Sequence, residues 1–364
     1  MWIEVGIATI KALVVILMIL QLAGTLGWIE RKGSALIQDR IGANRASIFG
    51  FAGAGLVNTL MADPLKFLTK EDIIPTGADR FLHTLAPCVN LFPALVAFAV
   101  IPFGDVLMVG GRVINLQVAS LNVGILYILA MASLGVYGVV LGGWASNNRW
   151  SLLGGIRGSA QMISYEIGLA LAIVAVVLTY GTLDLQEMAR AQGGLLLGFI
   201  PAWGIFYQPL AFIVLLVAGI AESKRIPFDL PESESELISG YFTEYSGMKH
   251  LMFFMTDFVE VIIVSGLATT LFFGGWQIPF LGREGFAFPG GVTLALPNLV
   301  IVVMQLLSFL IKVVFFCWLQ IMVRWTLPRF RYDQLMRLGW LGLLPIALAN
   351  VMLTAIVILT FGNF

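Results

Sequence analysis

Long apolar runs alternate with short polar connections along the whole chain. A helix that crosses a bilayer needs ~20 mostly apolar residues. Eight runs of about this length occur, at about 5–28, 84–103, 121–144, 161–181, 203–221, 251–274, 297–322 and 341–361. The pattern predicts an all-α, polytopic membrane protein with about eight transmembrane helices, in which residues 1–364 form a single membrane domain.

Basic residues are unequally distributed among the connections. The connections at 104–120, 182–202 and 275–296 contain one arginine each. Most lysines and arginines fall in the other four connections, at 29–83, 145–160, 222–250 and 323–340. The positive-inside rule therefore predicts that these four are on the inner side of the membrane and that both termini are on the outer side.

The longest inner connection, 29–83, mixes charged residues with apolar residues at helical spacing. Leu56, Leu60, Phe67 and Leu68 indicate an amphipathic helix that lies in the membrane interface. Pro64 stands between them and is expected to kink or begin that helix.

The composition argues against several functional classes. Hydrophobic residues make up 59% of the chain and charged residues 12%, which is about half the charge of a soluble domain. The net charge of zero gives no reason to expect nucleic acid as a partner. Two distant cysteines, Cys88 and Cys317, and two histidines, His83 and His250, do not suffice for a metal site or a haem between paired histidines. Any redox centre is therefore expected on another chain.

Acidic residues are concentrated in the connection at 222–250. Six of the chain's 21 acids lie there, Glu222, Asp229, Glu232, Glu234, Glu236 and Glu244. Asp229-Leu-Pro-Glu232 fits a capping box with Pro231 in the first helical turn. This interpretation explains Asp229 and Glu232 and leaves the other four acids without a structural role.

Further acids are predicted within the membrane at a similar depth. Glu166, Asp257 and Glu260 fall in the inner third of their spans, as does Glu222, and Asp257 and Glu260 share a helix face. A charge in hydrocarbon costs from about 2.5 kcal/mol upward, so such groups pair, face the bundle interior or line a wet path. Several acids at one depth, with pKa values raised by burial and by each other, suit a proton relay.

Ordinary pairing is the alternative interpretation of the same acids. Each acid then forms an interfacial salt bridge, with Lys224, Arg225 or Lys249 as partner. Two more lysines are predicted within the membrane. Lys11 is expected to extend outward, and Lys312 is expected either to pair with an acid or to reach the inner interface.

A basic and polar segment, residues 30–45, follows the first span. Its guanidinium and amide donors beside an apolar wall suit a lipid-like molecule with a carbonyl head group. The positive-inside signal, with basic residues that bind lipid phosphate, explains the same residues and is favoured on spacing alone.

Several blocks resemble a known family. These blocks are Glu30-Arg-Lys with Gln38-x-Arg40-x-Gly42-x-Asn44, Ala62–Glu71, Gly143–Gly155, Ala160–Glu166, Ala221–Ser246 and Arg324–Trp340. Together they occupy all four inner connections, and they resemble the quinone-site membrane subunit, the H subunit, of respiratory complex I. That complex is the proton-translocating NADH:quinone oxidoreductase.

The resemblance implies a subunit that is catalytic only within its complex. Its partners would be the other subunits of the peripheral and membrane arms, together with membrane lipid. Quinone would be the substrate, and it would reach an iron–sulfur cluster on a neighbouring subunit. The location would be an energy-transducing inner membrane, either the bacterial cell membrane or an organellar inner membrane, which the chain crosses several times.

The resemblance also implies roles for individual residues. The quinone-channel positions are Glu30, Arg31, Gln38, Arg40 and Asp63. The proton-path positions are Glu166, Glu222, Asp229, Glu232, Glu234, Glu236, Glu244 and Asp257. Two segments depart from the family pattern near the expected quinone channel. Ala43 replaces a proline, and Asn58-Thr-Leu-Met61 stands where a glutamine is often found.

Two other functions remain alternatives. The homologous subunit of a membrane-bound nickel–iron hydrogenase shares the acid-rich loop, although the blocks at 143–155 and 324–340 favour complex I. A stand-alone ion transporter belongs to a different class. The lack of an internal repeat and the length of the connection at 29–83 argue against it.

Overall fold

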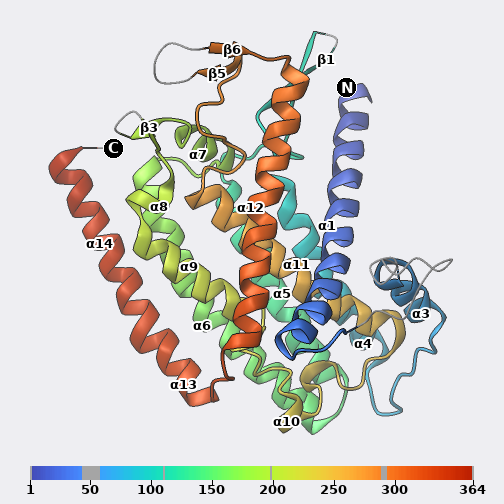
Figure 1. The fold of residues 1–364 in the computed structure, drawn as a ribbon. Coiled ribbons are helices and arrows are strands. Elements are labelled where there is room, and N and C mark those ends of the chain that lie inside the picture. Colours follow the sequence, from blue (N-terminus) through green and yellow to red (C-terminus); the bar gives the residue numbers. More distant parts are fainter. Residues whose placement is uncertain (1, 43–57, 110, 197–198, 288–292, 363–364) are drawn as a thin grey trace.

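The protein is an all-helical bundle with a few short strands (Figure 1). The computed structural model describes residues 2–42, 58–109, 111–196, 199–287 and 293–362. Within these residues, seven helical segments are long and apolar enough to cross a membrane. They are α1 (Trp2–Ile37), α4 (Arg80–Ala97), α5 (Gly124–Ala145), α6 (Arg149–Tyr180), α11 (Gly247–Phe272), α12 (Asn298–Thr326) and the segment that ends in α14 (Leu344–Phe361). The predicted polytopic all-α membrane fold is confirmed.

The run at 203–221 departs from the single span expected of it. It forms a short helix, α8 (Gly204–Tyr207), and a 14-residue helix, α9 (Pro209–Glu222). Proline has no N–H to donate to the preceding turn, so Pro209 begins a new helix and cannot continue α8. At 1.5 Å per residue α9 is about 21 Å long, shorter than the ~30 Å hydrocarbon layer.

The remaining helices are short. On the chain before α4, η2 (Asn58–Ala62) leads into α3 (Asp63–Thr69), and η3 (Phe98–Val100) follows α4. The connection after α6 contains α7 (Leu185–Ala191), and the acid-rich loop contains α10 (Glu234–Leu237) and η4 (Gly240–Phe242). Before α14, α13 (Tyr332–Arg337) and η5 (Leu338–Leu343) prolong the last segment.

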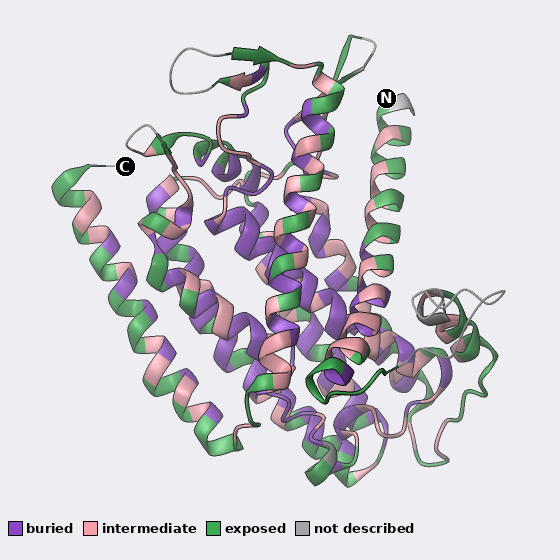
Figure 2. Ribbon diagram, in the orientation of Figure 1, coloured by how far each residue is buried: buried purple, intermediate pink, exposed green. Residues whose placement is uncertain are grey.

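Helix α11 lies at the centre of the bundle. It packs against α1, α4, α9 and α12, and most of its residues are buried on every side. Figure 2 shows buried residues along the inner helices and exposed ones along α1 and α14, which flank the bundle. Most exposed side chains in the middle of these flanking helices, such as Leu17 and Leu353, are apolar. A helix that is apolar on its exposed face as well as its buried one is typical of a membrane span.

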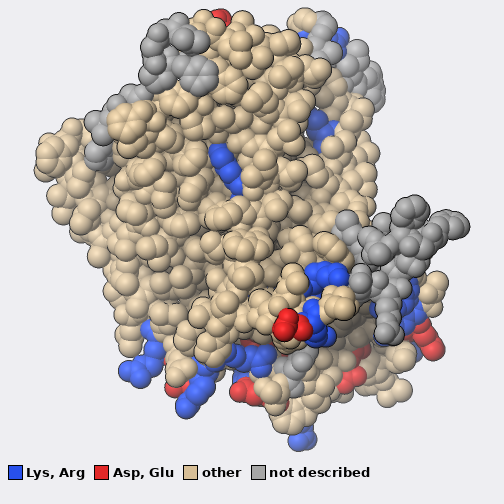
Figure 3. Space-filling model, viewed as in Figure 1, with Lys and Arg blue, Asp and Glu red and all other residues tan. Residues whose placement is uncertain are grey.

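The two ends of the bundle differ in structure and charge. Both termini lie at one end, here called the far end, together with three short antiparallel hairpins (Figure 1). The hairpins are β1 (Val106–Val109) with β2 (Arg112–Asn115), β3 (Leu195–Leu196) with β4 (Ile200–Pro201), and β5 (Gly285–Ala287) with β6 (Thr293–Ala295). The opposite end carries residues 222–250 and is here called the charged end, because the acidic and basic side chains gather there (Figure 3).

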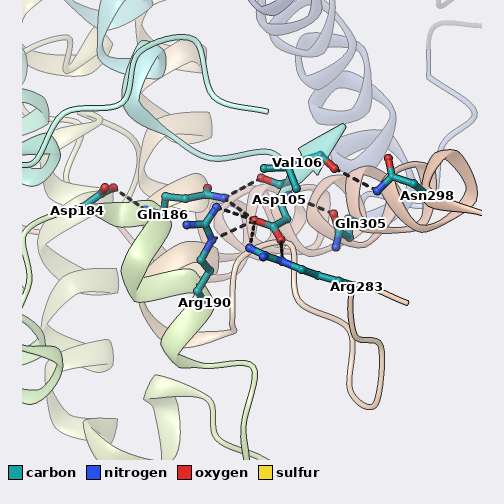
Figure 4. Close-up of polar contacts among 9 residues, drawn as sticks. Asp105, Val106, Asp184, Gln186, Arg190, Arg283, Asn298 and Gln305 are labelled. Carbon is teal, nitrogen blue, oxygen red and sulfur yellow. Dashed lines mark hydrogen bonds and ion pairs between the residues drawn. The ribbon is translucent and has the colours of Figure 1, made fainter. Parts of the chain in front are cut away.

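One buried carboxylate joins the connections at the far end (Figure 4). Asp105 is 4% exposed, and its Oδ1 accepts hydrogen bonds from Nε and Nη2 of Arg190 at 3.0 and 2.7 Å. Its Oδ2 accepts from Nε of Arg283 at 2.8 Å, and its backbone N–H donates to Oε1 of Gln305 at 3.1 Å. Asp105 thus ties all three far-end connections to one another and to α12.

Both intramembrane lysines extend toward the far end. Lys11 donates from Nζ to the carbonyl oxygen of Gln117 at 2.7 Å, as expected for an outward-directed side chain. The two expectations for Lys312, an acidic partner or the inner interface, are wrong. Its Nζ donates to the carbonyls of Phe273, Gly275 and Gln277 at 2.7–2.9 Å. The end of α11 leaves carbonyls unpaired within the helix, and the lysine satisfies carbonyls there.

Candidate functional site

Helix α1 extends beyond the predicted membrane span. Residues 30–37 were expected to begin a loop, but they continue α1 for two more turns to Ile37. Apart from Gly33 these residues include good helix formers, and no proline interrupts them. The helix therefore places Glu30 and Arg31 on adjacent faces at the charged end.

Glu30 bridges two arginines from distant parts of the chain. Its carboxylate accepts from Nη1 of Arg225 at 2.8 Å and lies 2.8 Å from Nη1 of Arg324. The Arg225 guanidinium also lies over the ring of Phe258, 4.0 Å from its centroid. Glu30 thereby joins α1 to the acid-rich loop and to the end of α12, at a position where its own side chain is only 14% exposed.

Lys224 forms a second buried ion cluster next to the first. Its side chain is fully buried, and its Nζ lies 2.8 Å from Oε2 of Glu260 and 3.3 Å from Oδ1 of Asp257. Burial alone would lower the pKa of Lys224, but the carboxylates of Glu260 and Asp257 outweigh it and raise that pKa. The raised pKa favours the charged form of Lys224, which neutralises part of the buried acidic charge.

The observed ion pairs agree with the alternative interpretation, ordinary salt bridges, for two of the buried acids. Asp257 and Glu260 share a helix face, as predicted, and both pair with Lys224. Arg225 binds Glu30 instead, and Lys249 binds Asp72 at 2.9 Å. Pairing explains why Asp257 and Glu260 are tolerated at this depth.

Glu222 lies at the end of α9 and faces a cavity of about 40 Å³. The cavity is lined by residues of α4, α5, α6, α9 and α11, and Glu260 also faces it. Glu166 on α6 accepts a hydrogen bond from the hydroxyl of Ser133 on α5 and interacts electrostatically with Glu222. The structure thus brings Glu166, Glu222 and Glu260 together, as their depth in the sequence indicated.

The predicted capping box at Asp229–Glu232 is wrong. Residues 230–232 form a turn, and α10 begins at Glu234 after Ser233, which makes no side-chain cap. Asp229 instead accepts a hydrogen bond from Nη2 of Arg329 at 2.9 Å. A guanidinium brought in by the fold is a stronger partner for the carboxylate than first-turn amides would be.

Burial changes the pKa values of two acids in this loop. Burial raises the pKa of Asp229 to about 6, against the opposing attraction of Arg329 and Arg324. Burial also raises the pKa of Glu232 well above its usual range, and the nearby Asp257 and Asp229 raise it further. Both carboxyls are therefore protonated more readily than surface acids.

Two other acids of the loop, Glu236 and Glu244, lie nearer the surface of the charged end. Glu236 is exposed and binds Nη1 of Arg157 at 2.6 Å. Glu244 accepts a hydrogen bond from the Asn148 side chain at 2.6 Å. The side chain of Glu234 lies outside the described part of the structure.

The residues expected at the quinone channel divide into two groups. Arg31 and Asp63 form an ion pair at 3.1 Å beside a pocket of about 220 Å³ between α1, α3 and α11. Gln38 and Arg40 hydrogen-bond to each other at 2.8 Å and are exposed beyond the end of α1. Glu30 belongs instead to the arginine cluster described above.

The expected amphipathic helix corresponds to η2 and α3. Pro64 stands in the first turn of α3 and so begins that helix. Phe67 faces the pocket, whereas Leu68 is exposed. Leu56 lies outside the described residues, as does Ala43, and Asn58–Met61 falls within η2.

Several partners in these clusters were not singled out by the sequence. They are Ser133, Asn148, Arg157, Arg324 and Arg329 for the acids, and Lys66 and His250 for the pocket. Lys66, Asn148, Arg324 and Arg329 lie in blocks that carried the family resemblance, which is the signal that could have indicated them.

These features define a polytopic helical membrane protein with a buried charged cluster and a neighbouring apolar pocket. A family model described as NADH dehydrogenase matches residues 10–355. A relative from Cytophaga hutchinsonii, named as an H subunit of NADH-quinone oxidoreductase, is 46% identical over 91% of both chains. A relative of the same name from Geobacter metallireducens is 46% identical over 96% of both chains. "NADH-quinone oxidoreductase subunit 8" from Rhodothermus marinus is 44% identical over 96% of this chain and 97% of its own. The chain belongs to the NADH dehydrogenase family, which confirms the predicted resemblance.

Proposed function

We propose that the chain is the membrane subunit of an NADH:quinone oxidoreductase that receives quinone and couples its reduction to proton translocation. The observation that carries the proposal is the pocket between α1, α3 and α11, which lies next to the buried charged cluster through α1. The relatives named as quinone oxidoreductase subunits favour this function over a hydrogenase subunit or a stand-alone transporter.

The pocket has the chemistry that a quinone needs. Gly24, Gly27, Phe254 and Met255 give it apolar walls that suit an isoprenoid tail. Arg31, Lys66 and His250 can donate hydrogen bonds to a carbonyl head group, and the Asp63 carboxylate pairs with Arg31 and Lys66. Gln38 and Arg40 extend these polar groups beyond the end of α1 and are proposed to face the incoming head group.

Helix α1 provides a short connection from the pocket to the acids. Arg31 borders the pocket, and the adjacent Glu30 holds Arg225, which follows Lys224 in the chain. A change of charge on the quinone alters the electrostatic energy of Arg31, and the Glu30–Arg225 pair lies one residue away. We infer that this shift changes the protonation of Asp229, Glu232 and Glu222, from which protons move onward through Glu166 and Asp257. Glu236 and Glu244 complete the path near the surface of the charged end, and Glu234 is proposed to belong to the same path.

The proposed complex supplies what this chain lacks. Its other subunits would form the peripheral and membrane arms, and a neighbouring subunit would carry the iron–sulfur cluster that reduces the quinone. The complex would reside in an energy-transducing inner membrane, and membrane lipid would cover the apolar flanks of α1 and α14.

Two substitutions in the assembled enzyme test the coupling role. Glu222→Gln and Glu236→Gln each remove a titrating carboxyl group and nearly keep the side-chain volume. We expect lower NADH:quinone turnover or fewer protons pumped per NADH, with unchanged NADH oxidation by an artificial acceptor. Unchanged proton pumping in both variants would contradict the relay assignment.

The KM for quinone tests whether this pocket binds quinone. Asp63→Asn removes the partner of Arg31 and is expected to raise the KM for quinone several-fold. Asp184→Asn, at the far end, is the matched control and should leave this KM unchanged. Equal KM values in the unaltered enzyme and both variants would argue against quinone binding in this pocket.

A further inference from the structure

Asn90 is a buried polar residue in the middle of α4. It is fully buried. Neither the oxygen nor the nitrogen of its side-chain amide has a hydrogen-bond partner among the residues that the structure describes. A side-chain amide has two donor hydrogens and an acceptor oxygen, and buried polar groups are nearly always satisfied by protein or by ordered water. The Asn90 amide therefore requires a partner other than these residues.

Helix α5 packs closely against Asn90 at one glycine, and the side-chain amide of Asn90 faces a second glycine. A Cβ on Gly138 would lie 2.7–2.8 Å from the Cβ and backbone of Asn90, so only glycine permits this close approach. A Cβ on Gly135 would lie 3.8 Å from Oδ1 of Asn90, which shows that the amide oxygen points toward Gly135. Gly135 lines the cavity that Glu222 and Glu260 also face.

The cavity contains three polar side chains in apolar surroundings. Its lining includes Asn90, Glu222 and Glu260, and the other lining residues are apolar, such as Leu169 and Leu267. One water molecule needs roughly 10–15 Å³ of such space, so a volume of about 40 Å³ accommodates about three. Water is stable in a cavity only where it has two or more polar partners, and these three side chains provide them.

We propose that this cavity binds a short chain of water molecules that Asn90 holds between Glu222 and Glu260. Asn90 is a positioning residue. Its amide both donates and accepts hydrogen bonds, and it orders the water molecules without adding a charge or a titrating group. The inference rests on the proposed proton-coupling function and adds to it a neutral residue and a bound ligand, water.

The proton transfer along the water molecules conserves both the protons and the water. Protonated Glu222 gives its proton to the first water, each water passes one proton on, and the ionised carboxylate of Glu260 receives one. Glu222 ends ionised and Glu260 ends neutral, and no water is gained or consumed. The charges that act on this exchange are Lys224 and Asp257 beside Glu260, and Glu166 on α6 beside Glu222.

Asn90→Leu in the assembled enzyme tests the proposal. Leucine has a similar volume but cannot hold water. We expect at least a fivefold loss of proton-coupled NADH:quinone turnover, with the KM for quinone unchanged. We also expect a shift of the protonated-carboxyl bands in infrared difference spectra, whereas Asn90→Ser, which retains a hydroxyl, should recover most of the activity.

Two further variants separate this role from a structural one. Asn350→Leu removes a different buried amide, which donates a hydrogen bond to the side chain of Gln208. This control variant should leave the infrared carboxyl bands unchanged. Gly135→Val leaves Asn90 in place but fills the cavity from α5, and it should reproduce the loss of turnover even if Asn90→Leu fails to assemble.

The outcomes distinguish the two proposals. If Glu222→Gln impairs coupling while Asn90→Leu and Gly135→Val leave turnover and the carboxyl bands unchanged, the water chain is overturned and the relay stands. If Glu222→Gln and Glu236→Gln both leave pumping intact, the proposed relay fails. In that case a shift of the carboxyl bands in Asn90→Leu would still show that Asn90 hydrates these acids.

Discussion

The ammonium group of Lys224 lies 2.8 Å from the carboxylate of Glu260, with both side chains largely removed from solvent. A buried ion pair contributes little net stability, but the loss of one partner leaves an uncompensated buried charge. We expect Lys224→Met to destabilise the protein by about 3–5 kcal/mol. The midpoint of thermal unfolding of the purified complex measures this loss.

A double substitution tests whether the loss comes from this pair. Glu260→Gln removes one of the charges that Lys224→Met leaves without a partner. The two substitutions together should therefore cost less than the sum of their separate effects. Strict additivity would show that Lys224 acts through other contacts.

The far end gives a prediction that is independent of quinone chemistry. Asp105→Asn removes the charge that holds Arg190 and Arg283, and it should destabilise the protein by about 1–3 kcal/mol. Because the site lies at the far end, the KM for quinone should not change. Asp184→Asn, which alters only the N-cap of α7, is the control and should cost less. An altered quinone KM in Asp105→Asn would contradict this separation of the two ends.

Hydropathy located seven of the eight predicted membrane spans but not their ends. Apolar runs located the spans because a bilayer requires them, whatever the neighbouring helices do. The extension of α1 through Arg31 and the break at Pro209 depend on local chain geometry that mean hydropathy does not record. The position of Pro209 was visible in the sequence and could have indicated the break.

The sequence indicated which acids lie together in the site, but it did not indicate most of the residues that pair with them. Depth in the membrane indicated that Glu166, Glu222 and Glu260 would lie together. The pair of Glu30 with Arg225 joins residues 195 positions apart, and no local pattern encodes such a contact. The capping interpretation of Asp229 failed for the same reason, since a distant residue, Arg329, competes with the local amides.

The pKa of Asp229 predicts a dependence of stability on pH. Its folded-state pKa of about 6 lies above its ordinary value of 3.8. Between these values the folded protein holds a proton that the unfolded chain has released, so stability falls as the pH rises through this window. The difference corresponds to on the order of 3 kcal/mol. Thermal unfolding between pH 4 and 7 should show this fall, and Asp229→Asn should reduce it. The same slope in both proteins would contradict the assignment.

Gly240 fixes the backbone of the acid-rich loop, and its replacement gives the last prediction. Its φ is +57°, and a Cβ there would lie 1.6 Å from the carbonyl oxygen of Pro231. Gly240→Ala must therefore displace Pro231 and the adjacent Glu232, which lowers quinone-dependent turnover as well as stability. Gly181 has a similar φ of +69°, but a Cβ there would meet no atom within 4 Å, so Gly181→Ala should cost only about 1–2 kcal/mol of backbone strain. Turnover and unfolding midpoints of the two variant complexes measure the difference. Equal losses in both would show that backbone conformation, and not the contact with Pro231, explains the glycine at position 240.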